Sequence, residues 1–546
     1  MHEVDIVIPA TGHSYNLSYW ENDETYHWHT AKCEHITEKT DEAKHTFVNN
    51  ICTECDYDAN KYVTFVDTEN YKIGLSVIIN GEITFPEDIT TNPDSQVYYD
   101  GWYQDLARTQ PITDFTFDDD IIIYAKKYII KKNLYSFTVN NGEATVVKSY
   151  LSEIAVFPKE YNGYPVTRIG ADCCKGSEIQ KAVITDNIKY IGNRSFNGCS
   201  NLVEVKIQGN NLIEIGEYAF GGCTNLTNIT IPNGVTSIDQ YAFYECTGLK
   251  SITILSGVIS IGLSAFEYCT GLTSVIIQDS VAKIGDWAFS GCTNLTNITI
   301  SDRVTFIGRR AFNNTAYYNN ENNWENDVLY IGNHLISAKP FLSDNYQIKQ
   351  GTITIGSMAF CECMNITSIT LPDSVTSIGD YAFYNCSGLT SITIPDGVTS
   401  IGGSAFYGCK PLTSITIPDS ITSIGGSAFS NTAYYNNEDN WKNGVLYIGK
   451  HLIDAKDTLS GDYQIKQGTL TIGGSAFYGC KSLTSITIPD SITTIDDYAF
   501  CNCSELTEIH FNGTKAQWNS ITKISTWNSN TGNYTVYCTG GEIKKS

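Results

Sequence analysis

Ile238-Asp-Gln-Tyr-Ala-Phe-Tyr-Glu-Cys-Thr-Gly-Leu-Lys-Ser-Ile-Thr-Ile254 is one copy of a segment that recurs about every 23 residues along this chain of 546 residues. A phenylalanine marks the register of each copy. The twelve equivalents are Phe196, Phe220, Phe243, Phe266, Phe289, Phe312, Phe360, Phe383, Phe406, Phe429, Phe477 and Phe500. A cysteine follows ten of them three residues later, and Thr315 and Thr432 take its place in the other two. Self-similarity at this period is typical of a solenoid.

The pattern Leu-x-x-Ile-x-Ile within each copy, as in Leu226 to Ile231, alternates apolar and polar residues. That alternation predicts a short strand with one buried face. We therefore expect one strand per coil in a parallel sheet, with the Ile-Gly-x-x-Ala-Phe segment crossing the opposite side as a short helical turn. The predicted fold class is mostly β, a parallel β-solenoid.

The repeat is interrupted twice, over 312–360 and 429–477, where the step lengthens to 48 residues. These two expanded units match each other at 36 of 49 positions at a shift of 117 residues. One expanded unit and three short coils thus form a larger repeat. Each expanded unit contains Ala-Tyr-Tyr-Asn-Asn, a tryptophan and Val-Leu-Tyr-Ile-Gly, which predicts an extra pair of strands beside an aromatic patch.

The repeat unit Ala-Phe-x-x-Cys-x-x-Leu-x-x-Ile-x-Ile-Pro-x-x-Val-x-x-Ile-Gly resembles that of the BspA-like leucine-rich repeat family, over roughly residues 134–511. The resemblance implies a leucine-rich repeat solenoid over 129–511 and a carboxy-terminal cap over 512–546. Cys173-Cys174 stands where Ala-Phe is expected, so the first coil is degenerate, as capping repeats are. Members of this family are usually bacterial surface or secreted proteins implicated in adhesion.

The aromatic residues of the expanded units are candidate ligand-binding residues, and they form two equivalent sets. They are Tyr317, Tyr318 and Trp324 in the first unit and Tyr434, Tyr435 and Trp441 in the second. Such a patch could bind a sugar or a partner surface, or it could cover the expanded coil as packing. Both interpretations stay open on the sequence alone.

The outward positions of the strands are mostly Thr, Ser and Asn, as at Thr390, Ser391 and Thr393, expected to stack over Thr413, Ser414 and Thr416. Threonine suits a pleated surface without any further role. Alternatively, a regular array of hydroxyl groups could meet a repetitive ligand such as a polysaccharide, another solenoid or ice.

The first 60 residues form a Cys/His-rich segment with the candidate metal ligands Cys33, His35, His45, Cys52 and Cys55. Cys-x-x-Cys lets two thiolates face one tetrahedral ion, and Cys33-Glu-His35 could complete a Cys3His site, with His45 as a substitute for His35. The segment has few aliphatic residues, so a structural zinc could replace a core. A disulfide between the two cysteines of Cys52-Thr-Glu-Cys55, or neither arrangement, stays open. The segment resembles zinc-ribbon-like modules that precede repeats in bacterial surface proteins.

Residues 61–128 resemble the internalin B-repeat family, whose fold is a β-grasp. The resemblance is carried by Tyr99-Asp-Gly-Trp-Tyr103 and by Asp120-Ile-Ile-Ile-Tyr-Ala125, although Lys126 follows Ala125 where the family usually has tryptophan. It implies a spacer or adhesion module found in secreted and surface proteins.

The net charge of −24 argues against nucleic acids and anionic membranes as partners. No apolar run approaches the roughly 18 residues of a membrane span, and no signal peptide is visible. No unique Ser-His-Asp or Cys-His set and no phosphate-binding loop stands out, so no catalytic residue is assigned. We expect a monomeric, non-enzymatic binding or adhesion protein, extracellular or at the cell surface, that recognises a protein or glycan of a host or neighbouring cell. A glycoside-processing enzyme and a purely structural spacer are the alternatives.

Overall fold

The computed structural model describes residues 134–545 apart from 255, 343 and 525, and before them only strands between 21 and 129. The chain divides into two units, Met1–Lys131 and Lys132–Ser546. In the described residues, no helix has the length and apolar character needed to cross a membrane.

The first unit contains short antiparallel hairpins and one four-stranded sheet. The hairpins pair β1 (Glu21–Asp23) with β2 (Tyr26–Trp28) and β3 (Phe47–Val48) with β4 (Ile51–Cys52). The sheet has the order β6 (Lys72–Ile78), β5 (Lys61–Val66), β8 (Ile121–Ile129), β7 (Val97–Tyr103). Its central strands β5 and β8 are parallel, and the outer pairs are antiparallel.

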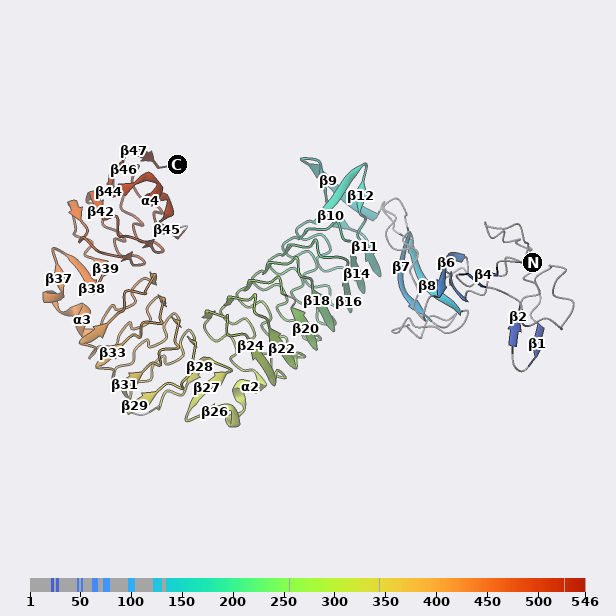
Figure 1. Cartoon of the computed structure of the whole chain (residues 1–546), viewed down its shortest axis with the longest axis horizontal. Coiled ribbons are helices and arrows are strands. Elements are labelled where there is room, and N and C mark those ends of the chain that lie inside the picture. The colour runs from blue at the N-terminus through green and yellow to red at the C-terminus, as the bar shows by residue number, and fades with distance from the viewer. Residues whose placement is uncertain are drawn as a thin grey trace. The chain divides into compact units, whose positions relative to one another are not determined.

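The second unit is a solenoid of stacked coils (Figure 1). Each coil contributes two strands, not the single strand that the repeat pattern predicts. The Leu-x-x-Ile-x-Ile segment forms the longer strand. The Ile-Gly segment was expected to begin the crossing of the opposite side. Instead, its isoleucine is the last residue of a second strand, which has two residues. The expectation of one strand per coil was wrong because the last isoleucine of the coil and the residue before it also pair with their copies above and below, as Ser237 and Ile238 do with Ser260 and Ile261.

The first block of the solenoid carries one ladder of longer and one of shorter parallel strands. The longer ladder is β11 (Ile154–Val156), β14 (Lys181–Ile184), β16 (Glu204–Ile207), β18 (Asn228–Ile231), β20 (Ser251–Ile254), β22 (Ser274–Ile277) and β24 (Asn297–Ile300). The shorter ladder is β13 (Tyr164–Ile169), β15 (Tyr190–Ile191), β17 (Glu214–Ile215), β19 (Ser237–Ile238), β21 (Ser260–Ile261), β23 (Lys283–Ile284) and β25 (Phe306–Ile307). It begins with the antiparallel hairpin of β9 (Tyr135–Asn140) and β10 (Glu143–Ser149), and β12 (Glu160–Tyr161) pairs with β13.

The two later blocks repeat this plan. The second block has the longer strands β29 (Asp344–Gln347), β31 (Ile366–Thr370), β33 (Ser391–Thr393) and β35 (Ser414–Thr416), and the shorter strands β30 (Thr354–Ile355), β32 (Ser377–Ile378), β34 (Ser400–Ile401) and β36 (Ser423–Ile424). The third has the longer strands β40 (Gly461–Gln464), β42 (Leu483–Ile488), β44 (Glu508–Thr514) and β46 (Thr535–Thr539), and the shorter strands β41 (Thr471–Ile472), β43 (Thr494–Ile495) and β45 (Thr522–Lys523). Helix α4 (Lys515–Ser520) and β47 (Gly541–Lys544), antiparallel to β46, complete the carboxy-terminal end. Both ends of the solenoid therefore carry an antiparallel hairpin, which protects the edge of a sheet.

The third side of each coil, called the turn side below, runs from the residue after the short strand, usually glycine, to the position three residues after the anchor phenylalanine, and it has no helix. This corrects the expected helical turn. Successive coils are joined there by main-chain hydrogen bonds, such as Phe220 N–H to Ala242 O and Phe243 N–H to Ala265 O, both 2.8 Å. The backbone turns because the residues two before and two after each anchor phenylalanine have φ between 51° and 75°, in all twelve coils. Main-chain ladders on three sides leave no room for a helix.

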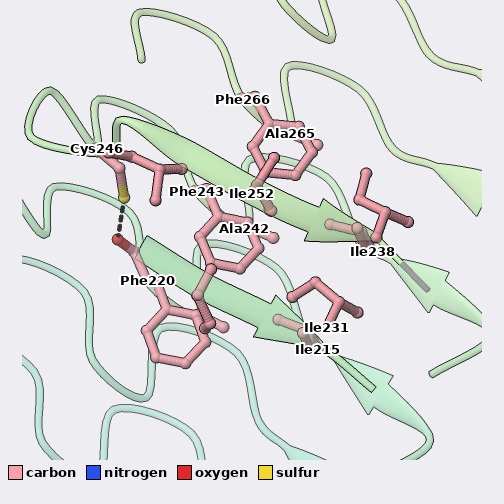
Figure 2. Close-up of a cluster of buried hydrophobic side chains, with 14 of the residues drawn as sticks. Ile215, Phe220, Ile231, Ile238, Ala242, Phe243, Cys246, Ile252, Ala265 and Phe266 are labelled. Carbon is pink, nitrogen blue, oxygen red and sulfur yellow. Dashed lines mark hydrogen bonds between the residues drawn. The ribbon is translucent and has the colours of Figure 1, made fainter. Parts of the chain in front are cut away.

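The anchor phenylalanines form a stack at the centre of each block. Within a block, neighbouring ring centroids lie 4.9–5.5 Å apart with interplanar angles of 1–10°. Figure 2 shows Phe220, Phe243 and Phe266 in this arrangement beside the strand isoleucines. Phe157 meets Phe196, the first ring of the first block, edge-on, and Trp527 meets Phe500, the last ring of the third block, edge-on. The first and the last stack are thus each closed on their outer side by a ring that does not belong to the repeat.

Each expanded unit inserts a hairpin between two blocks, as its sequence predicts. The first contains β26 (Trp324–Glu325), β27 (Val328–Ile331) and β28 (His334–Ala338); the second contains β37 (Trp441–Lys442), β38 (Val445–Ile448) and β39 (His451–Ala455). Strand β27 separates two hydrophobic cores, because Leu329 and Ile331 belong to the preceding one while Val328 and Tyr330 belong to the following one. The shorter strands continue past the hairpin through the bond of Ser357 N–H to Ile307 O, 2.9 Å.

Candidate functional site

The predicted aromatic residues gather in each expanded unit around one short helix and one 3-10 turn. Helix α2 (Ala316–Asn319) begins at Thr315, whose hydroxyl accepts the N–H of Tyr318, and η2 (Glu321–Asn323) leads into Trp324. The second unit repeats this with α3 (Ala433–Asn436) and η3 (Glu438–Asn440). The threonine that replaces the repeat cysteine is therefore the residue that caps the inserted helix.

In the first unit, the polar atoms of the aromatic residues bond to their own unit. Tyr317 donates its hydroxyl to Tyr330 O at 3.0 Å, and Trp324 donates its indole N–H to Tyr318 O at 2.8 Å. The Tyr318 and Trp324 rings meet edge to face at 5.2 Å, and the Lys339 ammonium lies over the indole at 5.3 Å. These side chains are half-buried and pack against the first hydrophobic core.

The second unit reproduces these contacts through Tyr434, Tyr435 and Trp441, with one added pair. Tyr434 donates to Tyr447 O at 3.1 Å, and Trp441 donates to Tyr435 O at 2.7 Å. Tyr435 also donates its hydroxyl to the carboxylate of Asp454 at 2.8 Å. Burial raises the pKa of Asp454 to about 6. The equivalent residue of the first unit is serine, so the two copies differ in charge at this point.

These contacts favour packing as the role of the aromatic residues. A sugar would need the indole N–H of each tryptophan and the hydroxyl of Tyr317 or Tyr434 as hydrogen-bond partners. These groups already donate to main-chain oxygens of the chain. The rings themselves are half covered by the unit. A ligand role for the six residues remains a prediction.

The predicted hydroxyl array is present on the longer strands. Ser391 pairs in register with Ser414, and Thr393 with Thr416; these four side chains are exposed, as are Thr390 and Thr413. Threonines at the start of this side also bond along the stack, because Thr390 donates to Thr367 O at 3.3 Å and Thr273 donates to Lys250 O at 3.4 Å. Part of the hydroxyl array is therefore engaged in joining coils, a role that the sequence pattern did not reveal.

The repeat cysteines bond to the coil that precedes them. The thiol of Cys246 donates to Phe220 O at 3.1 Å (Figure 2), and Cys223, Cys269, Cys292, Cys386, Cys409 and Cys503 do the same at 3.0–3.2 Å. All cysteines between 173 and 538 are free thiols. Burial raises the pKa of Cys246 and of Cys292 to about 12. Such thiols are poor nucleophiles.

The candidate metal ligands Cys33, His35, His45, Cys52 and Cys55 lie outside the described residues; only the main chain of Cys52 is placed, in β4. Within the part of the chain that the structure does describe, no group of three His, Cys, Asp or Glu side chains is placed to hold a metal ion. The histidines of the expanded units are structural: the ring of His451 bonds to Thr471 and to Pro418 O.

A surface that sequence analysis missed lies on the turn side of the first block. Tyr218, Tyr241, Tyr244 and Tyr268, called the tyrosine cluster below, come from three successive coils. The Tyr218 and Tyr241 rings stack at 4.5 Å and 3°. Tyr244 meets both edge-on, at 6.1 and 5.8 Å, and meets Tyr268 at 5.8 Å. The sequence signal that could have identified this cluster is the presence of tyrosines two residues before, or one or two residues after, the anchor phenylalanines of these three coils.

The chain matches the family "BspA type Leucine rich repeat region (6 copies)" over residues 167–281, 259–344, 336–460 and 447–536. Among solved structures, it is similar to a leucine-rich cell surface protein from Faecalibacterium prausnitzii, with 28% identity, 72% of this chain and 97% of that chain covered, and a TM-score of 0.30. It is also similar to a leucine-rich repeat protein from Bacteroides ovatus (20% identity, 73% and 97% covered, TM-score 0.30) and to the pneumococcal vaccine antigen PcpA (18%, 75% and 93%, 0.31). No curated protein matches.

Proposed function

Because this chain belongs to the BspA-type leucine-rich repeat family, we propose that it is a non-enzymatic binding or adhesion protein of a cell surface or extracellular space. Its partner would be a protein or glycan of a host or neighbouring cell. The observation that carries the proposal is the family match over most of the solenoid. Exposed faces that continue from coil to coil are what recognition of an extended partner requires.

The chemistry of the described residues supports a binding role. The thiols that recur in every block are buried, with pKa values raised by that burial. The histidine rings of the expanded units are buried within the coils and bonded to neighbouring main-chain oxygens. Burial lowers the pKa of both His334 and His451, which favours neutral, structural rings.

The test is a binding screen of the full chain on bacterial and mammalian cells, extracellular matrix proteins and a glycan array. We expect saturable binding to at least one of these surfaces, with no turnover of the ligand. Absence of binding in every arm would refute the proposal, and release of reducing sugar from any bound glycan would favour the glycoside-processing alternative.

The amino-terminal segments are proposed as accessory modules. We propose that residues 1–60 bind one structural zinc through Cys33, His35 or His45, Cys52 and Cys55, and that 61–128 is a β-grasp spacer. The sheet order β6-β5-β8-β7 with a parallel central pair supports the second proposal. Metal analysis of the purified chain, compared with its Cys52→Ser and Cys55→Ser variants, tests the first. Deletion of 61–128 with partner binding retained would support the spacer.

A further inference from the structure

The tyrosine cluster occupies backbone positions that do not favour tyrosine. Tyr218 and Tyr241 have φ of 51° and 57°, in the left-handed region that bulky residues rarely adopt. Other coils place serine at the same position, as at Ser264 with φ 51°. Neither tyrosine belongs to the hydrophobic core. The fold therefore does not require these rings, although it holds them stacked face to face.

The surroundings of the cluster are acidic. Burial raises the pKa of Tyr218 and of Tyr244, the latter to about 12. Nearby carboxylates raise it further: Glu217, Glu245 and Glu267 act on Tyr218, and Glu245 and Glu267 act on Tyr244. Among residues 134–545 as described, no ion pair is formed by any of these three glutamates. Arg194, whose charge reaches Glu217, is bonded to Asp172 at 3.0 Å.

The same side of the solenoid shows how a cation binds to such rings. The Arg309 guanidinium lies over Trp287 at 5.2 Å and over Tyr381 at 5.6 Å, and it bonds to Asp286 at 2.6 Å. Trp287 and Tyr381 stand two residues before an anchor phenylalanine, as Tyr218 and Tyr241 do. At this site the chain itself provides the cation, Arg309, to two aromatic rings and a carboxylate.

The tyrosine cluster has the aromatic faces and the carboxylates of that site without an arginine of its own. Rings attract cations through their faces, and guanidinium groups stack on them better than other cations do. We propose that the tyrosine cluster, with Glu245 and Glu267, docks arginine side chains of a basic polypeptide partner. This inference rests on the proposed binding function. It specifies that the partner is a cationic protein segment and that the binding site is the turn side of the coils over residues 217–268.

The experiment measures binding of the full chain to a fluorescein-labelled peptide of alternating arginine and glycine, by fluorescence anisotropy. We expect saturable binding that weakens at least fivefold between 50 and 300 mM salt, because exposed charges are screened. A peptide with citrulline in place of arginine keeps the shape without the charge and should bind at least tenfold more weakly. A lysine peptide should fall between the two.

The variants separate the site from the bulk charge of the chain. Tyr218→Ser with Tyr241→Ser places in both coils the residue that occupies this position at Ser264, and we expect at least fivefold weaker arginine-peptide binding with an unchanged circular-dichroism spectrum at the assay temperature. Glu245→Gln with Glu267→Gln should weaken binding similarly. The matched control is Tyr498→Ser, at the same position (φ 53°) and 42% exposed, which should change binding less than twofold.

Three results would overturn the inference. The first is arginine-peptide binding by the double serine variant equal to that of the unaltered chain, since binding would then follow net charge alone. The second is equal affinity for the citrulline peptide. The third is a glycan that binds the cluster while the arginine peptide does not. Binding to cells that persists in the serine variant would leave the proposed function intact, so the two failures are distinguishable.

Discussion

The stack of anchor phenylalanines leads to the sharpest prediction about stability. Phe243 is fully buried between Phe220, at 5.3 Å, and Phe266, at 5.2 Å. Replacing it with leucine keeps most of the apolar volume and removes two stacked ring pairs. Each aromatic pair contributes about 0.5–1.5 kcal/mol beyond its buried area, and a volume-conserving change in a core costs up to about 1.5 kcal/mol. We therefore expect Phe243→Leu to destabilise its coil by about 3 kcal/mol.

The part of this loss that comes from stacking is measured by a double-mutant cycle. For the neighbours Phe243 and Phe266, the coupling energy should be about 0.5–1.5 kcal/mol, because one direct ring pair is lost. For Phe220 and Phe266, which are separated by Phe243, the two changes should add to within about 0.5 kcal/mol. The Phe220 and Phe266 cycle is the control. It uses the same substitutions in the same block, so any general effect of losing apolar core volume is common to both cycles.

The assay is hydrogen exchange followed by mass spectrometry on peptides from the altered coils, since repeat arrays need not unfold in a single step. The free energy of local opening is compared among the single and double variants. Equal coupling in the adjacent and separated pairs would refute the reasoning, because the stack would then act as a general apolar core and not as a series of ring contacts.

Three further outcomes follow from the described contacts. Cys246→Ala should destabilise its coil by about 1 kcal/mol, because Phe220 O loses the thiol as a donor and keeps only the N–H of Cys223 at 3.1 Å. Cys246→Ser should recover part of that loss in urea unfolding; equal losses would contradict the role of the thiol as a donor. Burial raises the pKa of Asp454 from 3.8 to about 6, so the folded state binds the proton of this carboxyl more tightly than the unfolded state does. The contribution of Asp454 to the free energy of unfolding is therefore highest below pH 4. It falls by at most about 3 kcal/mol as the pH rises to about 6. Replacing Asp454 with serine, its counterpart in the first unit, should abolish that fall in pH-dependent melting curves, and an unchanged profile would exclude Asp454 as its source. Trp324→Ala should lower the melting temperature with partner binding retained; the reverse result would support a ligand site.

The repeat pattern predicted the main features of the fold because they depend on spacing alone. The period, the longer strand and the hairpin of the expanded units are all confirmed by the structure. The shorter strand was not predicted, because two residues such as Ser237 and Ile238 are too few for an alternation signal. It forms only because neighbouring coils present the same pair.

The sites were harder to predict than the fold. The sequence identified the aromatic residues of the expanded units because they interrupt a regular pattern, yet their hydrogen-bond partners are main-chain oxygens that no pattern reveals. The tyrosine cluster was missed for the opposite reason. Its members stand at variable positions in three coils, and only the stacking of those coils brings Tyr218, Tyr244 and Tyr268 together.

The hairpin that separates two cores in each expanded unit has a consequence for how such a chain can change in length. Strand β38 serves two cores as β27 does, since Leu446 and Ile448 join the preceding one and Val445 the following one. The same junction therefore ends one block and begins the next. If one larger repeat of 117 residues were lost or duplicated, the new junction between blocks would be the same as one that the chain already has. The hairpins at the two ends of the solenoid would not change. Gene recombination between the two copies would thus yield shorter or longer solenoids in single steps, each with complete cores.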